Sequence, residues 1–193
     1  MGGPLHKKTG DILKNLEKNL KIDVVLDKAC GIGKTGKSQN IPLFLKKEEI
    51  KSNETEICDV DAMVIKNNEI KIIIEIEESG FLPTKIYGKY MASNLAEYYA
   101  HDTLENEILE IKKSNVLFIQ IIDTKGLESI SSKPEQFKNI EKSINNLIKT
   151  VKDAGISLGC IKEYKLLQID GNKIESNPLL FNEFENIIKD AIE

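Results

Sequence analysis

DVDAMVIKNNEIKIIIEIEE, residues 59–78, predicts two neighbouring β-strands joined by a tight turn. The first strand is expected over Ile57–Lys66, and the second over Glu69–Glu77, where β-branched residues dominate as in a buried strand. Asn67 and Asn68 separate the two runs, and asparagine is a residue type that tight turns favour. The other predicted elements are arranged around this hairpin.

Acidic side chains gather at one end of the predicted hairpin. Because side chains alternate along a strand, Asp59 and Asp61 share one face of the first strand, and Glu75 and Glu77 share one face of the second. Up to four carboxylates could therefore converge at the end of the sheet. Like charges that close raise one another's pKa unless a cation lies among them. Carboxylates on two rigid strands suit Mg²⁺, an ion that supports hydrolysis of phosphate esters.

These residues resemble the motif of the PD-(D/E)XK nucleases, a superfamily with many restriction endonucleases and DNA-repair nucleases. In that family an Asp begins one strand and (D/E)-x-K lies on the next. Asp61 matches the Asp, Glu75 the D/E position and Glu77 the Lys position, where this chain carries Glu. The resemblance implies a restriction-endonuclease-like fold, an α/β domain whose mixed β-sheet is flanked by helices, with its core motif region over 56–99.

The same resemblance implies Mg²⁺-dependent hydrolysis of DNA phosphodiester bonds, as in a type II restriction endonuclease or a related DNA-processing nuclease, with Mn²⁺ as a substitute. It assigns Asp61, Glu75 and the Ile76 carbonyl to the metal, with Asp59 as the alternative ligand from the first strand. Glu77 is expected to orient or activate the attacking water in place of Lys. DNA is the expected partner, and a homodimer is the expected assembly.

A helix is predicted to open at Pro83, since proline suits the first turn of a helix, and to continue to Tyr99. Lys85 and Lys89 are four residues apart and share one face of this helix. Either lysine could replace the missing motif Lys, so both are candidate catalytic residues. The alternative is that they are solvated surface lysines.

The composition of the chain sets further limits. Its 193 residues suit a single domain over 1–193, and 40% hydrophobic with 30% charged residues is typical of a globular protein. No apolar run approaches the roughly 18 residues that span a membrane, and the start lacks the pattern of a secretory signal. A cytoplasmic protein without a membrane partner is therefore expected. The widely spaced Cys30, Cys58 and Cys160 predict free thiols.

The charge balance weighs against indiscriminate binding of nucleic acid. The net charge is −4 and the chain contains no Arg, the residue that most often reads guanine and phosphate through two parallel hydrogen bonds. A DNA enzyme with this composition needs its lysines gathered on one face. A catalytically inactive member of the nuclease fold is one alternative, because a motif whose Lys position carries Glu77 can also mark lost activity.

The second alternative is a P-loop nucleotide-binding protein. Gly31–Ser38, GIGKTGKS, satisfies G-x-x-x-x-G-K-[ST], in which backbone amides cradle phosphate and the Lys and Ser bind the outer phosphates and Mg²⁺. Val116–Asp123 also matches the apolar strand ending in Asp that such enzymes use. A P-loop requires a helix directly after it, and Pro42 is too far along to lie in a first helical turn.

The rest of the chain predicts helices interspersed with strands. Glu17 is a secondary metal candidate by the resemblance, because the family often places an acid of its first helix near the metal; the alternative is a solvent-facing Glu. His101 is expected to pack or cap near a helix end. Helices are expected over Leu5–Leu20, Thr103–Lys113, from Ser132 to Gly155 and from Asn177 onward; strands are expected over Ile22–Leu26, Ile41–Leu45, Asn115–Ile122, Ile156–Ile161 and Tyr164–Ile169.

Overall fold

The structure, a computed structural model, describes residues 2–31, 40–47, 54–79, 82–100, 108–125, 127 and 133–193. Four α-helices and nine strands lie in these ranges, with two short 3₁₀ helices near the end of the chain. In chain order they are α1 (Pro4–Asn19), β1 (Asp23–Leu26), β2 (Ile41–Phe44), β3 (Glu56–Val60), β4 (Ala62–Lys66), β5 (Glu69–Glu77), α2 (Pro83–Leu95), β6 (Tyr98–Ala100), β7 (Ile108–Glu110), β8 (Val116–Asp123), α3 (Lys133–Asp153), β9 (Ile161–Ile169), η1 (Gly171–Lys173), η2 (Pro178–Phe181) and α4 (Asn182–Ile192).

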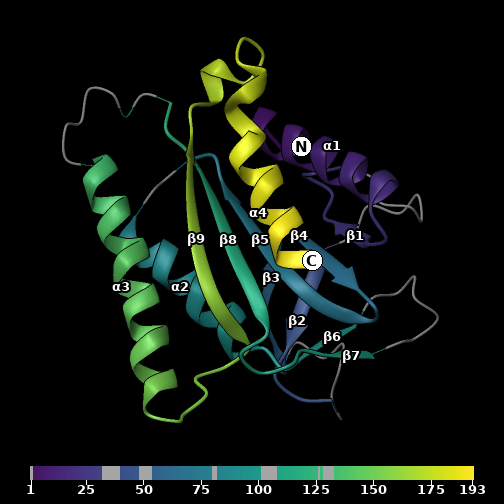
Figure 1. Ribbon diagram of the computed structural model, residues 1–193, viewed down its shortest axis with the longest axis vertical. Coiled ribbons are helices and arrows are strands. Elements are labelled where there is room, and N and C mark those ends of the chain that lie inside the picture. Colours follow the sequence, from purple (N-terminus) through teal and green to yellow (C-terminus); the bar gives the residue numbers. More distant parts are fainter. Residues whose placement is uncertain are drawn as a thin grey trace.

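The larger of two sheets has the strand order β1-β4-β5-β8-β9 (Figure 1). Its first three strands pair antiparallel, whereas β5, β8 and β9 are parallel to one another, so the sheet is mixed. The smaller sheet, β3-β2-β6-β7, is antiparallel throughout. All eight residues of β8 are buried, as expected for a parallel strand covered on both faces.

Helices cover both faces of the larger sheet (Figure 1). The buried side chains of α1 and α4, such as Leu13 and Phe184, pack on one face of it. Those of α2 and α3, such as Tyr90 and Phe137, pack on the opposite face together with the smaller sheet. The predicted α/β class, a mixed sheet flanked by helices, is therefore confirmed. No helix in the described ranges is both long and apolar enough to cross a membrane.

The hairpin that organises the sequence is present as β4 and β5. Asn67 and Asn68 both have positive φ, 54° and 59°, as a two-residue turn between twisted strands requires. The single strand expected over Ile57–Lys66 is wrong, because the chain changes sheets at Asp61. Residues before Asp61 form β3 and pair with β2, and residues after it form β4 and pair with β1 and β5.

Several other element predictions need correction. Ile108–Glu110 forms strand β7 rather than part of a helix over Thr103–Lys113; residues 103–107 lie outside the described ranges. α2 ends at Leu95, where the backbone becomes extended at Ala96, and Tyr99 belongs to β6, whose pairing with β2 buries it. The two strands predicted over Ile156–Ile161 and Tyr164–Ile169 are replaced by one strand, β9. It begins at Ile161, because pairing with β8 starts there.

Candidate functional site

Asp61 lies against the backbone of β5, at the start of β4. Its amide donates to the carbonyl of Ile74, and its Oδ2 accepts a hydrogen bond of 2.7 Å from the amide of Ile76. Since the N–H and C=O of one strand residue point to the same edge, the Ile76 carbonyl also lies on the Asp61 side of β5. The hairpin register thus brings Asp61 beside the Glu75–Glu77 segment, as the sequence predicts.

The two glutamates of this segment are buried and contact the lysines of α2. Lys89 forms an ion pair with Glu75, whose side chain is 1% exposed, and approaches Glu77 Oε1 at 3.1 Å. Lys85 pairs with Glu77 Oε2 at 2.5 Å. The spacing of four residues on α2 therefore places both ammonium groups over the acids of β5. The solvated-lysine alternative does not describe Lys89, although Lys85 is 47% exposed.

Burial and mutual repulsion set the proton affinities in this cluster. Burial, followed by the nearby charge of Asp61, raises the pKa of Glu75 well above its usual value of 4.5, and Lys89 offsets part of that rise. Burial also favours a higher pKa for Asp61, but contact with His6, the charge of Lys89 and the Ile76 amide together bring that pKa below its usual value. Although burial opposes it, the surrounding carboxylates raise the pKa of Lys89, which therefore stays an ammonium group.

α1 contributes a residue that sequence reasoning missed, His6. Its Nε2 lies 3.7 Å from Asp61 Oδ1, and its Nδ1 lies 3.4 Å from Glu78 Oε2. Glu78 follows β5 and its Oε1 accepts from the amides of Leu5 and His6, so a carboxylate takes the place of a side-chain cap at the N-terminus of α1. No spacing in the sequence links His6 to Asp61, because the contact depends on how α1 docks.

The close docking of α1 depends on small residues. A Cβ at Gly10 would lie 2.0 Å from the backbone oxygen of Cys30, and one at Gly3 would lie 1.7 Å from Glu78 Oε2. The atoms beside Gly10 are backbone, so the helix can approach the chain after β1 this closely only with glycine at that position, whereas the flexible end of the Glu78 side chain can move away from a Cβ at position 3. This approach is what brings His6 to Asp61.

We expect the imidazole of His6 to titrate above 6.5, and the Asp61→Asn variant to lower its pKa. Burial opposes protonation of His6, but Asp61 and Glu78 outweigh it and raise the pKa. Stability from these contacts is complete below pH 6.5 and is lost as the pH rises through the raised pKa. The measurement is an NMR titration of the imidazole carbons, with His101→Gln used to assign the two histidines. An unchanged His6 pKa in Asp61→Asn would show that the pair does not interact.

Two other acids predicted near the metal lie elsewhere. Asp59 belongs to β3 in the smaller sheet, is exposed, and accepts a hydrogen bond of 3.1 Å from Asn40. The change of sheet at Asp61 breaks the face parity that predicted a shared face. Glu17 Oε1 accepts a hydrogen bond of 2.8 Å from the Val24 amide and so joins α1 to β1. It is therefore neither beside the candidate metal site nor simply a solvent-facing Glu.

The charge of the acidic cluster and the oxygen atoms that it offers suit a divalent cation that is held by few protein ligands. Four carboxylates face two ammonium groups and one imidazole, an excess of negative charge. A cation between Asp61 and Glu75 would offset the repulsion that raises the pKa of Glu75. Among the described residues, no three His, Cys, Asp or Glu side chains form a metal-binding group. Two carboxylates, the Ile76 carbonyl and waters suit Mg²⁺, which uses few protein ligands.

The second motif, Gly31–Ser38, lies almost wholly outside the described residues, from 32 onward. The next described element is strand β2 rather than the helix that a P-loop requires. Asp123, at the end of β8, accepts hydrogen bonds of 2.8 Å from the amides of Lys125 and Gly171, and so stabilises the turn that follows the strand. Cys30, Cys58 and Cys160 are free, as predicted; His101 lies outside the described ranges.

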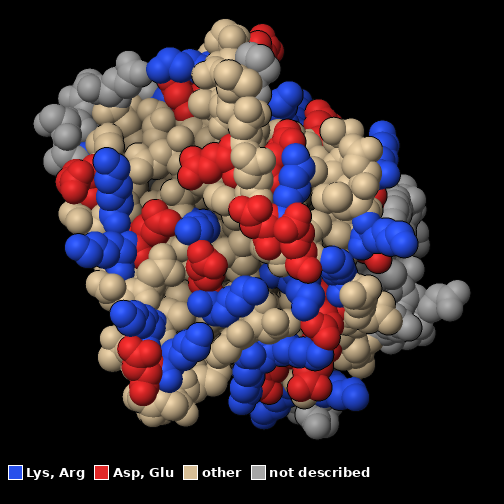
Figure 2. Space-filling model, in the orientation of Figure 1, with Lys and Arg blue, Asp and Glu red and all other residues tan. Residues whose placement is uncertain are grey.

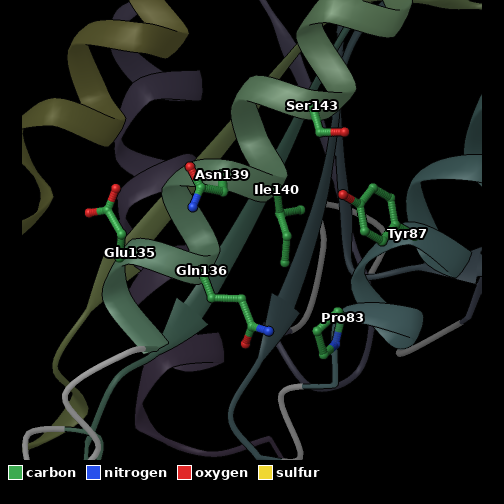
Figure 3. Close-up of a pocket in the computed structure, with 7 residues that line it drawn as sticks. All are labelled: Pro83, Tyr87, Glu135, Gln136, Asn139, Ile140 and Ser143. Atoms are coloured by element: carbon green, nitrogen blue, oxygen red, sulfur yellow. The ribbon is translucent and has the colours of Figure 1, made fainter.

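A groove of about 740 Å³ lies between α2 and α3 and is separate from the acidic cluster (Figure 3). Its walls combine Pro83 and Tyr87 of α2 with polar side chains of α3, among them Gln136 and Asn139. None of the residues that line it belongs to the cluster of Asp61, Glu75 and Glu77. α2 therefore presents its lysines to the acids and Tyr87 to the groove.

Comparison with protein-family models, with curated proteins and with solved structures finds no match to this chain.

Proposed function

We propose that this protein is a Mg²⁺-dependent endodeoxyribonuclease with a restriction-endonuclease-like fold, that Mn²⁺ can replace Mg²⁺, and that it acts as a homodimer on DNA. The observation that carries the proposal is the meeting of Asp61, Glu75 and Lys89 at one point. An Asp at the start of one strand, a Glu on the next and a lysine beside both reproduce the chemical groups of the PD-(D/E)XK motif.

Lys89 supplies the cation that the motif lacks at position 77. It comes from α2 instead of β5, yet it contacts both Glu75 and Glu77. Because the carboxylates keep Lys89 protonated, its role is to stabilise the negative charge that develops on the phosphate, not to accept a proton. Glu77 is the group that accepts a hydrogen bond from the attacking water.

Asp61, Glu75 and the Ile76 carbonyl would hold Mg²⁺ in this proposal. The ion supplies Lewis acidity toward the phosphate and lowers the pKa of water. The residues contribute position: the Ile76 amide fixes Asp61, and Lys89 fixes Glu75. His6 completes the cluster on the α1 side, where it contacts the Asp61 oxygen that the backbone leaves free.

The face of the molecule formed by α3, β9 and α4 carries charges of both signs. Figure 2 shows acidic and basic side chains interspersed over this face rather than a continuous basic surface. Binding of a phosphate backbone needs clustered cations, since the affinity comes largely from released counterions. In the proposed enzyme, the scissile phosphate would lie beside Lys85 and Lys89, the two lysines that contact the acids at the end of β5.

The test of the proposal is a calorimetric titration of the wild type with Mg²⁺ and Mn²⁺, together with cleavage of supercoiled plasmid DNA. We expect metal binding and cleavage, and loss of cleavage when EDTA removes the metal. Asp59→Asn serves as the matched control, because Asp59 is an exposed acid two residues from Asp61 and should leave both unchanged. A wild type that neither binds metal nor cleaves DNA would refute the proposal of a nuclease.

A further inference from the structure

Gln120, in the middle of β8, is a fully buried polar residue whose side-chain amide makes a hydrogen bond through its oxygen but not through its nitrogen. Its side chain is 0% exposed, and its Oε1 accepts a hydrogen bond of 2.8 Å from the hydroxyl of Tyr164. Its Nε2 has no hydrogen-bond partner among the described residues. A buried donor without a partner destabilises the fold, so its presence calls for an explanation.

The sheet register places this amide beside the candidate metal ligand Glu75. β5 and β8 are parallel, and Glu75 pairs directly with Gln120. Residues paired in this way point to the same face of a sheet. Contact with Lys89 puts Glu75 on the α2 face. Phe118, two residues before Gln120, lies in the core beneath α2 and α3, so Gln120 points to that face as well.

Tyr164 determines which way the amide is turned. It belongs to β9, on the other side of β8 from Glu75, and it holds Gln120 Oε1. Its ring is fixed in turn, because it stacks on Phe118 at 5.8 Å and meets Tyr90 edge-on at 5.7 Å. With the oxygen held on the β9 side, the amide nitrogen is left for the β5 side, where Glu75 lies.

We propose that Gln120 is a positioning residue for Glu75, whose carboxylate it holds by an N–H donor when that carboxylate binds the metal. In this structure Lys89 pairs with Glu75 Oε2. When the Glu75 carboxylate turns toward a metal ion, it would give up part of its contact with Lys89 and accept a hydrogen bond from the Gln120 amide instead. Second partners of this kind orient a ligand and typically change metal affinity ten- to a hundredfold. The inference rests on the proposed function, since it assigns a role at that metal site.

The decisive variant is Gln120→Met, which keeps the length of the side chain and removes the amide. We expect the Kd for Mn²⁺, measured by calorimetry, to rise about tenfold or more. The melting temperature is expected to change little or to fall slightly, because the variant removes a buried donor without a partner but also leaves the buried Tyr164 hydroxyl without its acceptor. A glutamine that only fills space would leave Mn²⁺ affinity unchanged.

Two further variants separate the possible outcomes. Tyr164→Phe leaves the amide in place but frees it to rotate, and we expect a smaller increase in the Mn²⁺ Kd of a few fold. It also serves as the test if Gln120→Met fails to fold. Gln168→Met is the matched control, because Gln168 pairs with Ile122 rather than with Glu75 and should leave the Kd unchanged.

The result also distinguishes this inference from the proposed function. A wild type that binds no Mn²⁺ overturns the metal site, and the role of Gln120 with it. A wild type that binds Mn²⁺, together with Gln120→Met and Tyr164→Phe variants of equal affinity, overturns the role of Gln120 alone.

Discussion

Glu75→Gln is expected to lower Mg²⁺-dependent cleavage of plasmid DNA by about a thousandfold, a loss of about 4 kcal/mol in transition-state stabilisation. The substitution keeps the shape of the side chain but removes the charge that would hold the ion. Since Glu75 is buried and faces Asp61, no other carboxylate on β5 can take its place without moving. The measurement is the rate of plasmid nicking at saturating Mg²⁺, with Mn²⁺ affinity determined on the same samples.

The fold of Glu75→Gln should remain intact, and its stability should depend less on pH. The raised pKa means that folded Glu75 keeps its proton above pH 4.5, where the unfolded chain has lost it. Stability from this group is therefore lost as the pH rises from 4.5 through the folded pKa, and the variant lacks that slope. Asp59→Asn is again the control. Retained cleavage in a folded Glu75→Gln protein would exclude Glu75 as a metal ligand.

The part of the site that lies within the hairpin could be predicted from the sequence. Alternation along β5 put Glu75 and Glu77 on one face, and the Asn67-Asn68 turn fixed the register that brings Asp61 to them. Local geometry determines both relations, so a single sequence contains them. The spacing of Lys85 and Lys89 was informative for the same reason, because helix geometry puts both on one side of α2.

The part that depends on contacts between distant elements could not be predicted. His6 reaches Asp61 because α1 docks closely against Cys30 and Glu78, and nothing at positions 3–10 indicates that partner. Asp59 and Asp61 are equivalent in the sequence, because both fit one alternating strand. In the structure Asp59 instead belongs to the second sheet, where β3 pairs with β2. Gln120 is a polar residue in the middle of a largely apolar strand, and its relation to Glu75 follows only from the pairing of β5 with β8.

Lys89→Met is expected to destabilise the protein by about 2–4 kcal/mol at pH 8 and to lower cleavage by about a hundredfold. When Lys89 loses its ammonium group, Glu75 loses its paired cation, and Lys85 is the cation left beside Glu77 among the described residues. Removing one partner of a buried ion pair is costly because the other charge stays buried. The free energy of unfolding, measured in urea, should approach that of the wild type as the pH falls and Glu75 takes up a proton.

Lys85→Met provides the matched control for this prediction. Lys85 is 47% exposed and, among the described residues, forms an ion pair with Glu77 only, so its loss should cost about 1 kcal/mol or less. Adding Glu75→Gln to Lys89→Met removes the unpaired carboxylate, so the double variant should regain much of the lost stability without regaining cleavage. Because Glu75→Gln alone should remove most of the cleavage, the double variant tests only the effect of Lys89 on the fold. Cleavage by folded Lys89→Met, compared with Lys85→Met, tests its effect on the phosphate, and equal effects of these two variants would contradict the role assigned to Lys89.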